Sequence, residues 1–153
     1  MGHCITGLVA APSVLTKLSR HHPLPAPVPL NQGLAFLPLR GIDLDAFLQQ
    51  PQDGFPEGFN YLSAQLIDRL LTASRLGPLA YVEMEYFAGA GIQGAAVFRD
   101  GKLLMQPVSA GIGPVNLALG LLGVRVAGDQ QDAFEAIGLY RHRHTEEWVA
   151  AAG

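Results

Sequence analysis

The stretch that decides the fold is AYVEMEYFAGAGIQGAAVFRDGKLLMQ, residues 80–106. It contains three runs with the length and the apolar, β-branched or aromatic content of strands, over 80–87, 92–98 and 102–106. Asp100 and Gly101 separate the last two runs, and this pair favours a two-residue type I′ hairpin turn. The stretch therefore predicts a β-meander over residues 80–107.

Three glycines in this stretch, Gly89, Gly91 and Gly94, match the G-x-G-x-x-G pattern of phosphate-binding loops. A dinucleotide site needs a helix directly after the glycines, because the N-terminus of that helix binds the pyrophosphate. Residues 95–98 are too few for a helix before the Asp100 turn, and no acid lies between Asp100 and Asp129 to hold a ribose. The kinase glycine loop fits no better, since no H-R-D or D-F-G motif is present. We expect no nucleotide and no other cofactor.

The same glycines have a structural interpretation. Gly89 and Gly91 are expected in the turn between two strands, where glycine adopts positive φ angles at low cost. Gly94 leaves a gap in the face of the next strand, and we expect the ring of Tyr86 or Phe87 to fill it.

Outward from the meander, the sequence predicts helices and two earlier strands. Residues 61–75 have the periodicity of an amphipathic helix, with Asn60 as its cap. Shorter helices are expected over 13–19, after Asp43 or Asp45, from Gly113-Pro114 to Leu122, after Asp129, and from Thr145; strands are expected over 4–9 and 34–39. This order predicts one α+β domain over 1–153, with a mostly antiparallel sheet of about five strands covered by helices.

Composition excludes several classes of protein. The formal net charge is −3 and charged residues make up 15% of the chain, so nucleic acid is not an expected partner. No apolar run approaches the 18 residues of a membrane-spanning helix, so we expect no membrane association. Cys4 is the only cysteine, which favours the cytoplasm, and we expect it to be buried in the first strand. No acidic residue precedes Asp43. Residues 43–68, in contrast, include acidic residues but no lysine or arginine.

The strand YVEMEYF presents a candidate binding surface. Alternation places Tyr81, Glu83, Glu85 and Phe87 on one face, which we expect to be the solvent face. Glutamates two residues apart lie about 7 Å from each other, a separation suited to acid–base or metal chemistry. Two aromatic rings beside two carboxylates also suit the binding of another protein. Gln93, next to the gap at Gly94, belongs to the same candidate set.

The sequence YRHRHTEEW near the C-terminus supplies the remaining candidates, Arg141, His142, Arg143 and His144. Alternating histidines can bind a metal, but the interleaved arginines repel a cation and only one ligand pair is present, so no metal is expected. A polar connector leading into the last helix is the simpler hypothesis. A third hypothesis places Arg141 or Arg143 over the Glu83/Glu85 face.

Three segments together, EYFAGAGIQGAAVF, GPVNLALGLLG and RHRHTEEW, resemble small uncharacterised bacterial proteins, some of which are similar to immunity proteins of toxin systems. The resemblance covers about the C-terminal half of the chain. It implies a cytoplasmic protein that binds a partner protein, and it brings no catalytic residues with it.

Two functional hypotheses remain open from the sequence. The first, which we favour because no complete catalytic set is present, is a protein-binding module, such as an immunity-type inhibitor. The second is a small enzyme or ligand carrier with a site near residues 89–94, using Glu83 or Glu85 and a histidine of the tail.

Overall fold

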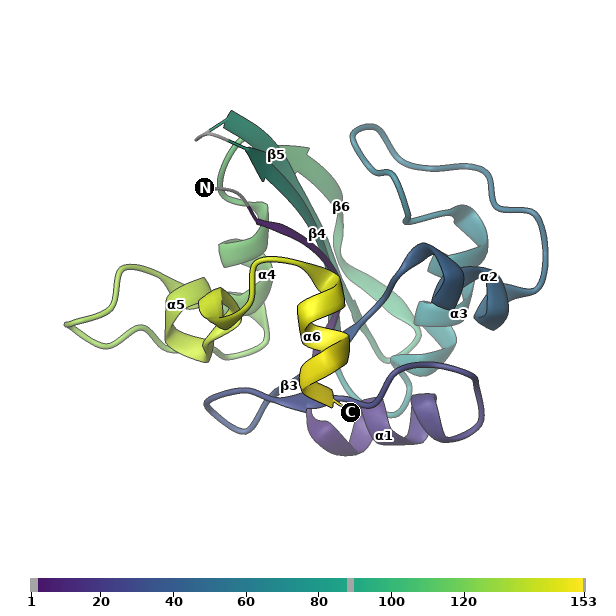
Figure 1. Ribbon diagram of the computed structural model, residues 1–153, viewed down its shortest axis with the longest axis horizontal. Helices are drawn as coiled ribbons and strands as arrows, with labels where there is room; N and C mark the ends of the chain where they lie inside the picture. The colour runs from purple at the N-terminus through teal and green to yellow at the C-terminus, as the bar shows by residue number, and fades with distance from the viewer. Residues whose placement is uncertain (1–2, 88–89, 153) are drawn as a thin grey trace.

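The computed structural model describes residues 3–87 and 90–152. Within them the strands form one antiparallel sheet in the order β2-β3-β1-β4-β5-β6, with helices on both of its faces (Figure 1). The strands are β1 Cys4–Ala10, β2 Val28–Pro29, β3 Ala35–Pro38, β4 Leu79–Phe87, β5 Ala90–Arg99 and β6 Lys102–Ala110. The helices are α1 Pro12–Arg20, α2 Gly41–Leu48, α3 Ala64–Ala73, α4 Pro114–Leu121, α5 Ala133–Ile137 and α6 Thr145–Ala152, with a 3-10 turn over Leu139–Arg141. The α+β class is confirmed.

The predicted meander is formed by β4, β5 and β6. Asp100 and Gly101 both have positive φ, 53° and 78°, as the type I′ turn requires. The pairing brings Glu83 opposite Gly94 and Tyr81 opposite Ala96. No helix within the described ranges is long and apolar enough to cross a membrane.

The sheet is buried on both faces, which corrects the expected solvent-exposed face of β4. Leu8, Tyr81 and Phe98 pack under α1, α2 and α3. On the opposite face, Val9 and Val82 belong to a second core with residues of α4, α5 and α6, including the fully buried Trp148. Alternation along the strand assigned residues to faces correctly, but it carries no information about how many faces the helices cover.

The gap at Gly94 is filled by Phe59. A Cβ atom at Gly94 would lie 2.6 Å from the Phe59 ring, which is buried. The prediction that an aromatic ring fills the gap is therefore confirmed, but the expected rings, Tyr86 and Phe87, are wrong. Tyr86 lies on the opposite face and Phe87 points into solvent, so only a ring from another segment reaches the gap. Gly91 lies within β5, paired with Tyr86, and not in the turn with a positive φ as expected. Gly89 lies outside the described residues.

Helix α3 begins later than its periodicity predicted. Its cap is Ser63, whose Oγ accepts a hydrogen bond from the Leu66 N–H at 3.1 Å. The expected cap, Asn60, is wrong because the helix begins at Ala64; the Asn60 backbone N–H donates to the Glu83 carboxylate. Helix α5 likewise begins after Asp132, not Asp129.

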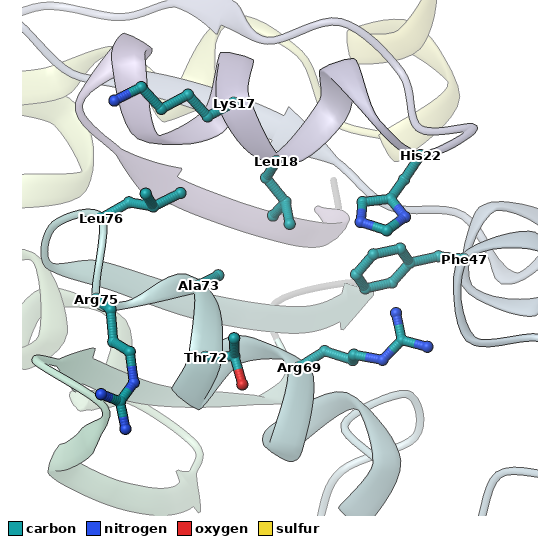
Figure 2. A pocket seen from close by; sticks show the side chains of 9 residues that line it. All are labelled: Lys17, Leu18, His22, Phe47, Arg69, Thr72, Ala73, Arg75 and Leu76. Carbon is teal, nitrogen blue, oxygen red and sulfur yellow. The ribbon is translucent and has the colours of Figure 1, made fainter.

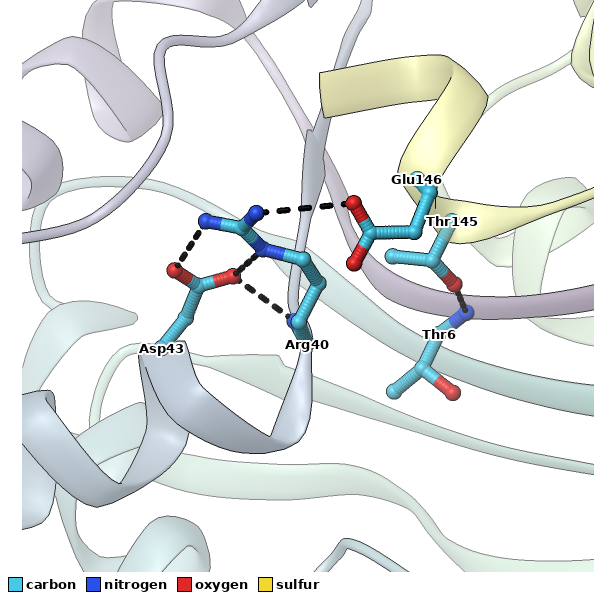
Figure 3. A network of polar contacts seen from close by, with 5 residues as sticks. All are labelled: Thr6, Arg40, Asp43, Thr145 and Glu146. Carbon is cyan, nitrogen blue, oxygen red and sulfur yellow. Dashed lines mark hydrogen bonds and ion pairs between the residues drawn. The ribbon is translucent and has the colours of Figure 1, made fainter. Parts of the chain in front are cut away.

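Helix α2 is connected to α6 through Arg40, the residue before its first turn (Figure 3). The Asp43 carboxylate accepts from the Arg40 backbone N–H at 2.8 Å and from Nε and Nη2 of its guanidinium at 2.8 and 3.0 Å. Glu146 of α6 lies 3.5 Å from Nη1 of the same guanidinium. The hydrogen bonds to Asp43 raise the pKa of Arg40. Asp43 is therefore the third residue of the helix, not its N-cap as expected.

Candidate functional site

The structure separates the nine candidate residues predicted from the sequence. Glu83 is buried, and its carboxylate accepts hydrogen bonds from the Asn60 N–H at 2.5 Å, the Tyr61 N–H at 3.1 Å and the Tyr81 hydroxyl at 2.7 Å. Burial raises the pKa of Tyr81 well above its ordinary value, and the neighbouring Glu83 charge raises it further. Three donors satisfy the carboxylate. Glu83 and Tyr81 thus hold the segment before α3 against the sheet and are not part of a surface.

Glu85 and Phe87, farther along the same strand face, are exposed, and the Phe87 side chain is 82% exposed. The neighbour of Glu85 across the strand pair is Cys4, which is exposed instead of buried as expected. The helices that cover this face of the sheet stop short of this end, so strand position alone did not bury the thiol. Partial burial of the thiol is the main cause that raises the pKa of Cys4, and the charges of Glu85 and Glu83 raise it further. A nucleophilic thiolate needs a lowered pKa.

Gln93 lies on the opposite face of the sheet and is buried. Its side-chain oxygen accepts from the Val115 N–H at 2.7 Å, in the first turn of α4, and its amide donates to the Tyr86 hydroxyl at 2.8 Å. A cavity of about 440 Å³ borders it, lined also by His3, Asn116 and Asp132. Asn116 and Asp132 are satisfied there by each other and by the backbone of α5.

The C-terminal tail has a structural role. Arg141 donates to the Pro29 carbonyl and to the Asn31 side chain at 3.2 and 2.8 Å. The ring of His142 packs edge-on against Trp148, with 4.7 Å between centroids. The Arg143 and His144 N–H groups donate to the Glu147 carboxylate, which lowers the pKa of Glu147.

This tail adds a short bridge to β1, where the Cys4 N–H donates to the Arg143 carbonyl at 2.7 Å. His144 is thereby brought beside Cys4, whereas no ion pair joins Arg141 or Arg143 to Glu83 or Glu85 in the described part of the chain. The hypothesis of an arginine neutralising the glutamate face is therefore not supported. Over residues 3–87 and 90–152, no three side chains of the types that bind metals come together as a site.

A different cluster has the features of a binding site. Helices α1, α2 and α3 enclose a cavity of about 400 Å³, which we call the cationic pocket (Figure 2). Its lining residues are Lys17, Leu18, His22, Phe47, Arg69, Thr72, Ala73, Arg75 and Leu76. Cavities of roughly 300 to 1,000 Å³ hold small organic ligands.

One end of the cationic pocket is aromatic and cationic. The rings of His22 and Phe47 meet edge to face, with 4.8 Å between centroids. The Arg69 guanidinium carbon lies 5.2 Å from the centroid of the Phe47 ring, a cation–π arrangement that fixes its position. Burial and the nearby Arg69 charge lower the pKa of His22, which favours the neutral form of its imidazole.

The rest of the pocket has an apolar floor and a second charged end. Leu18 and Ala73 are buried under it, and Leu76 is half exposed at its edge. Figure 2 shows Lys17 and Arg75 on either side of Leu76, at the end away from His22. The Arg75 side chain also packs against Gly101 in the β5–β6 turn.

The electrostatics of the pocket are one-sided. Lys17, Arg69 and Arg75 take part in none of the ion pairs found within residues 3–87 and 90–152. All three side chains reach the cavity, and no acidic residue lines it. The lining of the hollow therefore combines basic side chains with apolar surface.

The sequence does contain signs of this pocket. Arg69, Thr72, Ala73 and Leu76 follow the i, i+3, i+4, i+7 spacing of one helix face, and no acid precedes Asp43. This spacing alone does not distinguish the face from a solvated one, because it does not show that α1 packs beside α3. The position of α1 was the missing information.

No known protein family, curated protein or solved structure matches this chain. The cationic pocket is therefore interpreted from its own geometry and charge.

Proposed function

We propose that this protein is a non-enzymatic binding protein that takes a small organic anion in the cationic pocket. The observation that carries the proposal is the placement of Lys17, Arg69 and Arg75, without ion pairs among the described residues, at the two ends of an apolar hollow of about 400 Å³. An acidic ligand gains charge-assisted hydrogen bonds there, while its carbon skeleton leaves water for the Leu18 and Ala73 surface.

The lining of the pocket favours binding over catalysis. Thr72 supplies its hydroxyl and His22 its titratable ring, and no hydrogen bond between these two residues is found in the described structure. The Thr72 hydroxyl donates instead to the Asp68 carbonyl at 3.3 Å. A nucleophile activated by a base requires the two within hydrogen-bond reach.

A second candidate function is favoured by the exposed end of the sheet. Phe87 is 82% exposed, and Glu85 is exposed two residues before it on the same face of β4; Ile112, in the segment after β6, is 81% exposed. Large exposed apolar side chains next to an acid suit a protein partner, such as the toxin of an immunity pair. Under either function we propose a cytoplasmic bacterial protein whose partner is not a nucleic acid.

Protein NMR tests the first function. Octanoate and suberate, the eight-carbon monocarboxylate and dicarboxylate, serve as probes, and octane-1,8-diol is the uncharged control. We expect saturable shifts at Leu18, Arg69 and Ala73 with at least one acid, and no saturable shifts with the diol. Arg69→Gln should weaken binding, whereas Arg125→Gln, at an exposed arginine outside the pocket, should not. Absence of saturable shifts with both acids would refute the function.

Affinity capture from the native host separates the second function from the first. If the exposed end of the sheet binds a protein, Phe87→Ser should abolish capture of one specific partner. The Arg69→Gln variant should still capture that partner. Capture that is unaffected by Phe87→Ser would exclude this surface as the site.

A further inference from the structure

We propose that the ligand of the cationic pocket is an extended organic dianion, with an acidic group at each end of an apolar chain. This inference rests on the function proposed above and names its ligand class. Its basis is the distribution of charge: cations stand at both ends of the pocket and apolar side chains lie between them.

The two ends are formed by the same pair of helical segments. Along the first segment Lys17 precedes His22, and along the second Arg69 precedes Arg75. In Figure 2, His22 lies with Arg69 and Phe47, and Lys17 lies toward Arg75 and Leu76. The segments therefore run in opposite directions, and each contributes one group to each end.

The near end suits a carboxylate. The stacking of Arg69 on Phe47 occupies a face of the guanidinium and leaves its N–H edge for a planar acid. The His22 ring beside it adds a hydrogen-bonding nitrogen.

The far end suits a second acid. Lys17 and Arg75 are exposed and flank Leu76, so a chain that passes over Leu18 and Ala73 emerges between two cations. Arg69 lies within α3, which ends at Ala73, and Arg75 lies in the turn that follows, so the two ends are more than one helical turn apart. An extended dicarboxylate with about six methylene groups is a suitable probe for two ends separated in this way.

Calorimetry at low salt with the full-length protein tests this ligand class, because screening weakens exposed charge pairs. We expect suberate to bind roughly tenfold more tightly than octanoate, as two additional partly exposed charge pairs would provide. Succinate, whose carboxylates are too close together to reach both ends, should bind no more tightly than octanoate.

Variants assign the two ends. Lys17→Ala combined with Arg75→Gln should weaken suberate binding roughly tenfold and octanoate binding less, so that the two affinities become similar. Arg69→Gln should weaken both ligands. Lys102→Ala combined with Arg125→Gln removes the same number of exposed cations outside the pocket and should change neither affinity. Circular dichroism verifies that each variant is folded.

The possible failures are distinct. Equal affinities for octanoate and suberate, tight succinate binding, or equal weakening of both acids by the Lys17/Arg75 pair would overturn the dianion and leave organic-anion binding intact. Failure of both eight-carbon acids to bind would overturn the dianion together with the proposed function.

Discussion

At the residue scale, the pairing of Gly94 with Glu83 positions the segment that leads into α3. The missing side chain at Gly94 admits the Phe59 ring, and the neighbouring Glu83 carboxylate binds the Asn60 and Tyr61 N–H groups. Three consecutive residues of the loop are thus fixed by one cross-strand pair. The gap was predictable from the sequence, but the ring that fills it was not, because Phe59 is 35 positions away in the chain.

We expect Gly94→Ala to destabilise the fold by about 1 to 3 kcal/mol, because the new methyl group displaces a buried ring. Urea unfolding measures the loss. Gly120→Ala is the control: it lies in α4 with nothing within 4 Å of the new atom, and helix propensity favours alanine. Equal stability of Gly94→Ala and the wild type would contradict the packing of Phe59 over Gly94.

Glu83→Ala should cost about 2 kcal/mol, since it removes the acceptor of three hydrogen bonds. Hydrogen exchange gives a local measure: the Asn60 and Tyr61 amides should lose protection selectively. Glu85→Ala, at the exposed position on the same face, should leave both amides and the stability unchanged. If the Asn60 and Tyr61 amides exchange equally in the two variants, Glu83 is not the anchor.

The titration of two histidines gives a prediction of pH dependence. Burial lowers the pKa of His3 and of His22, with Arg143 and Arg69 respectively as the next causes. Below the ordinary pKa of 6.5, the unfolded chain therefore binds protons that the folded chain does not, and folding stability decreases. The free energy of unfolding should fall as the pH drops from 7 to 5.5. In His22→Gln this fall should be smaller; an identical slope would contradict the assignment.

At the element scale, the helix boundaries show what local patterns determine. The starts of α1 and α4 at Pro12 and Pro114, and of α6 at Thr145, agree with the expected helices, because proline and threonine act through the adjacent backbone. Boundaries that depend on tertiary contacts were wrong. Asn60 has a side chain that is common at helix N-caps, but its backbone N–H is bound by the Glu83 carboxylate of β4 and the helix begins farther along the chain.

Helix α2 provides the prediction at this scale. Asp43→Ala should lower stability by about 1 to 2 kcal/mol, because it removes both the acceptor of the Arg40 backbone N–H and the two-pronged pair with the Arg40 guanidinium. Glu146→Ala should have no measurable effect, since the Glu146 side chain is 73% exposed and its pair with Arg40 is long. Thermal unfolding compares the stabilities of the two variants. Equal losses of stability in Asp43→Ala and Glu146→Ala would show that the ion pair with α6 contributes as much as the contacts between Arg40 and Asp43.

At the scale of the whole molecule, the sequence predicted an antiparallel sheet with helices but not a sheet covered on both faces. Helical periodicity identifies α3, yet only the packing of α1 and α2 beside it creates the cationic pocket. The nine residues singled out from the sequence were grouped by proximity along the chain. In the fold they divide between a loop anchor, a cap of α4, the end of the sheet and a structural tail.

The central claim, that the cationic pocket binds an organic anion, is tested most directly at the His22 ring. Burial and Arg69 hold the pKa of His22 below its ordinary value, and an anion bound between them opposes the effect of Arg69. NMR titration of the histidine ring protons, with and without saturating suberate, should show the pKa of His22 rising while that of His3, which does not line the pocket, stays unchanged. An unchanged pKa of His22 at saturating suberate would contradict the claim.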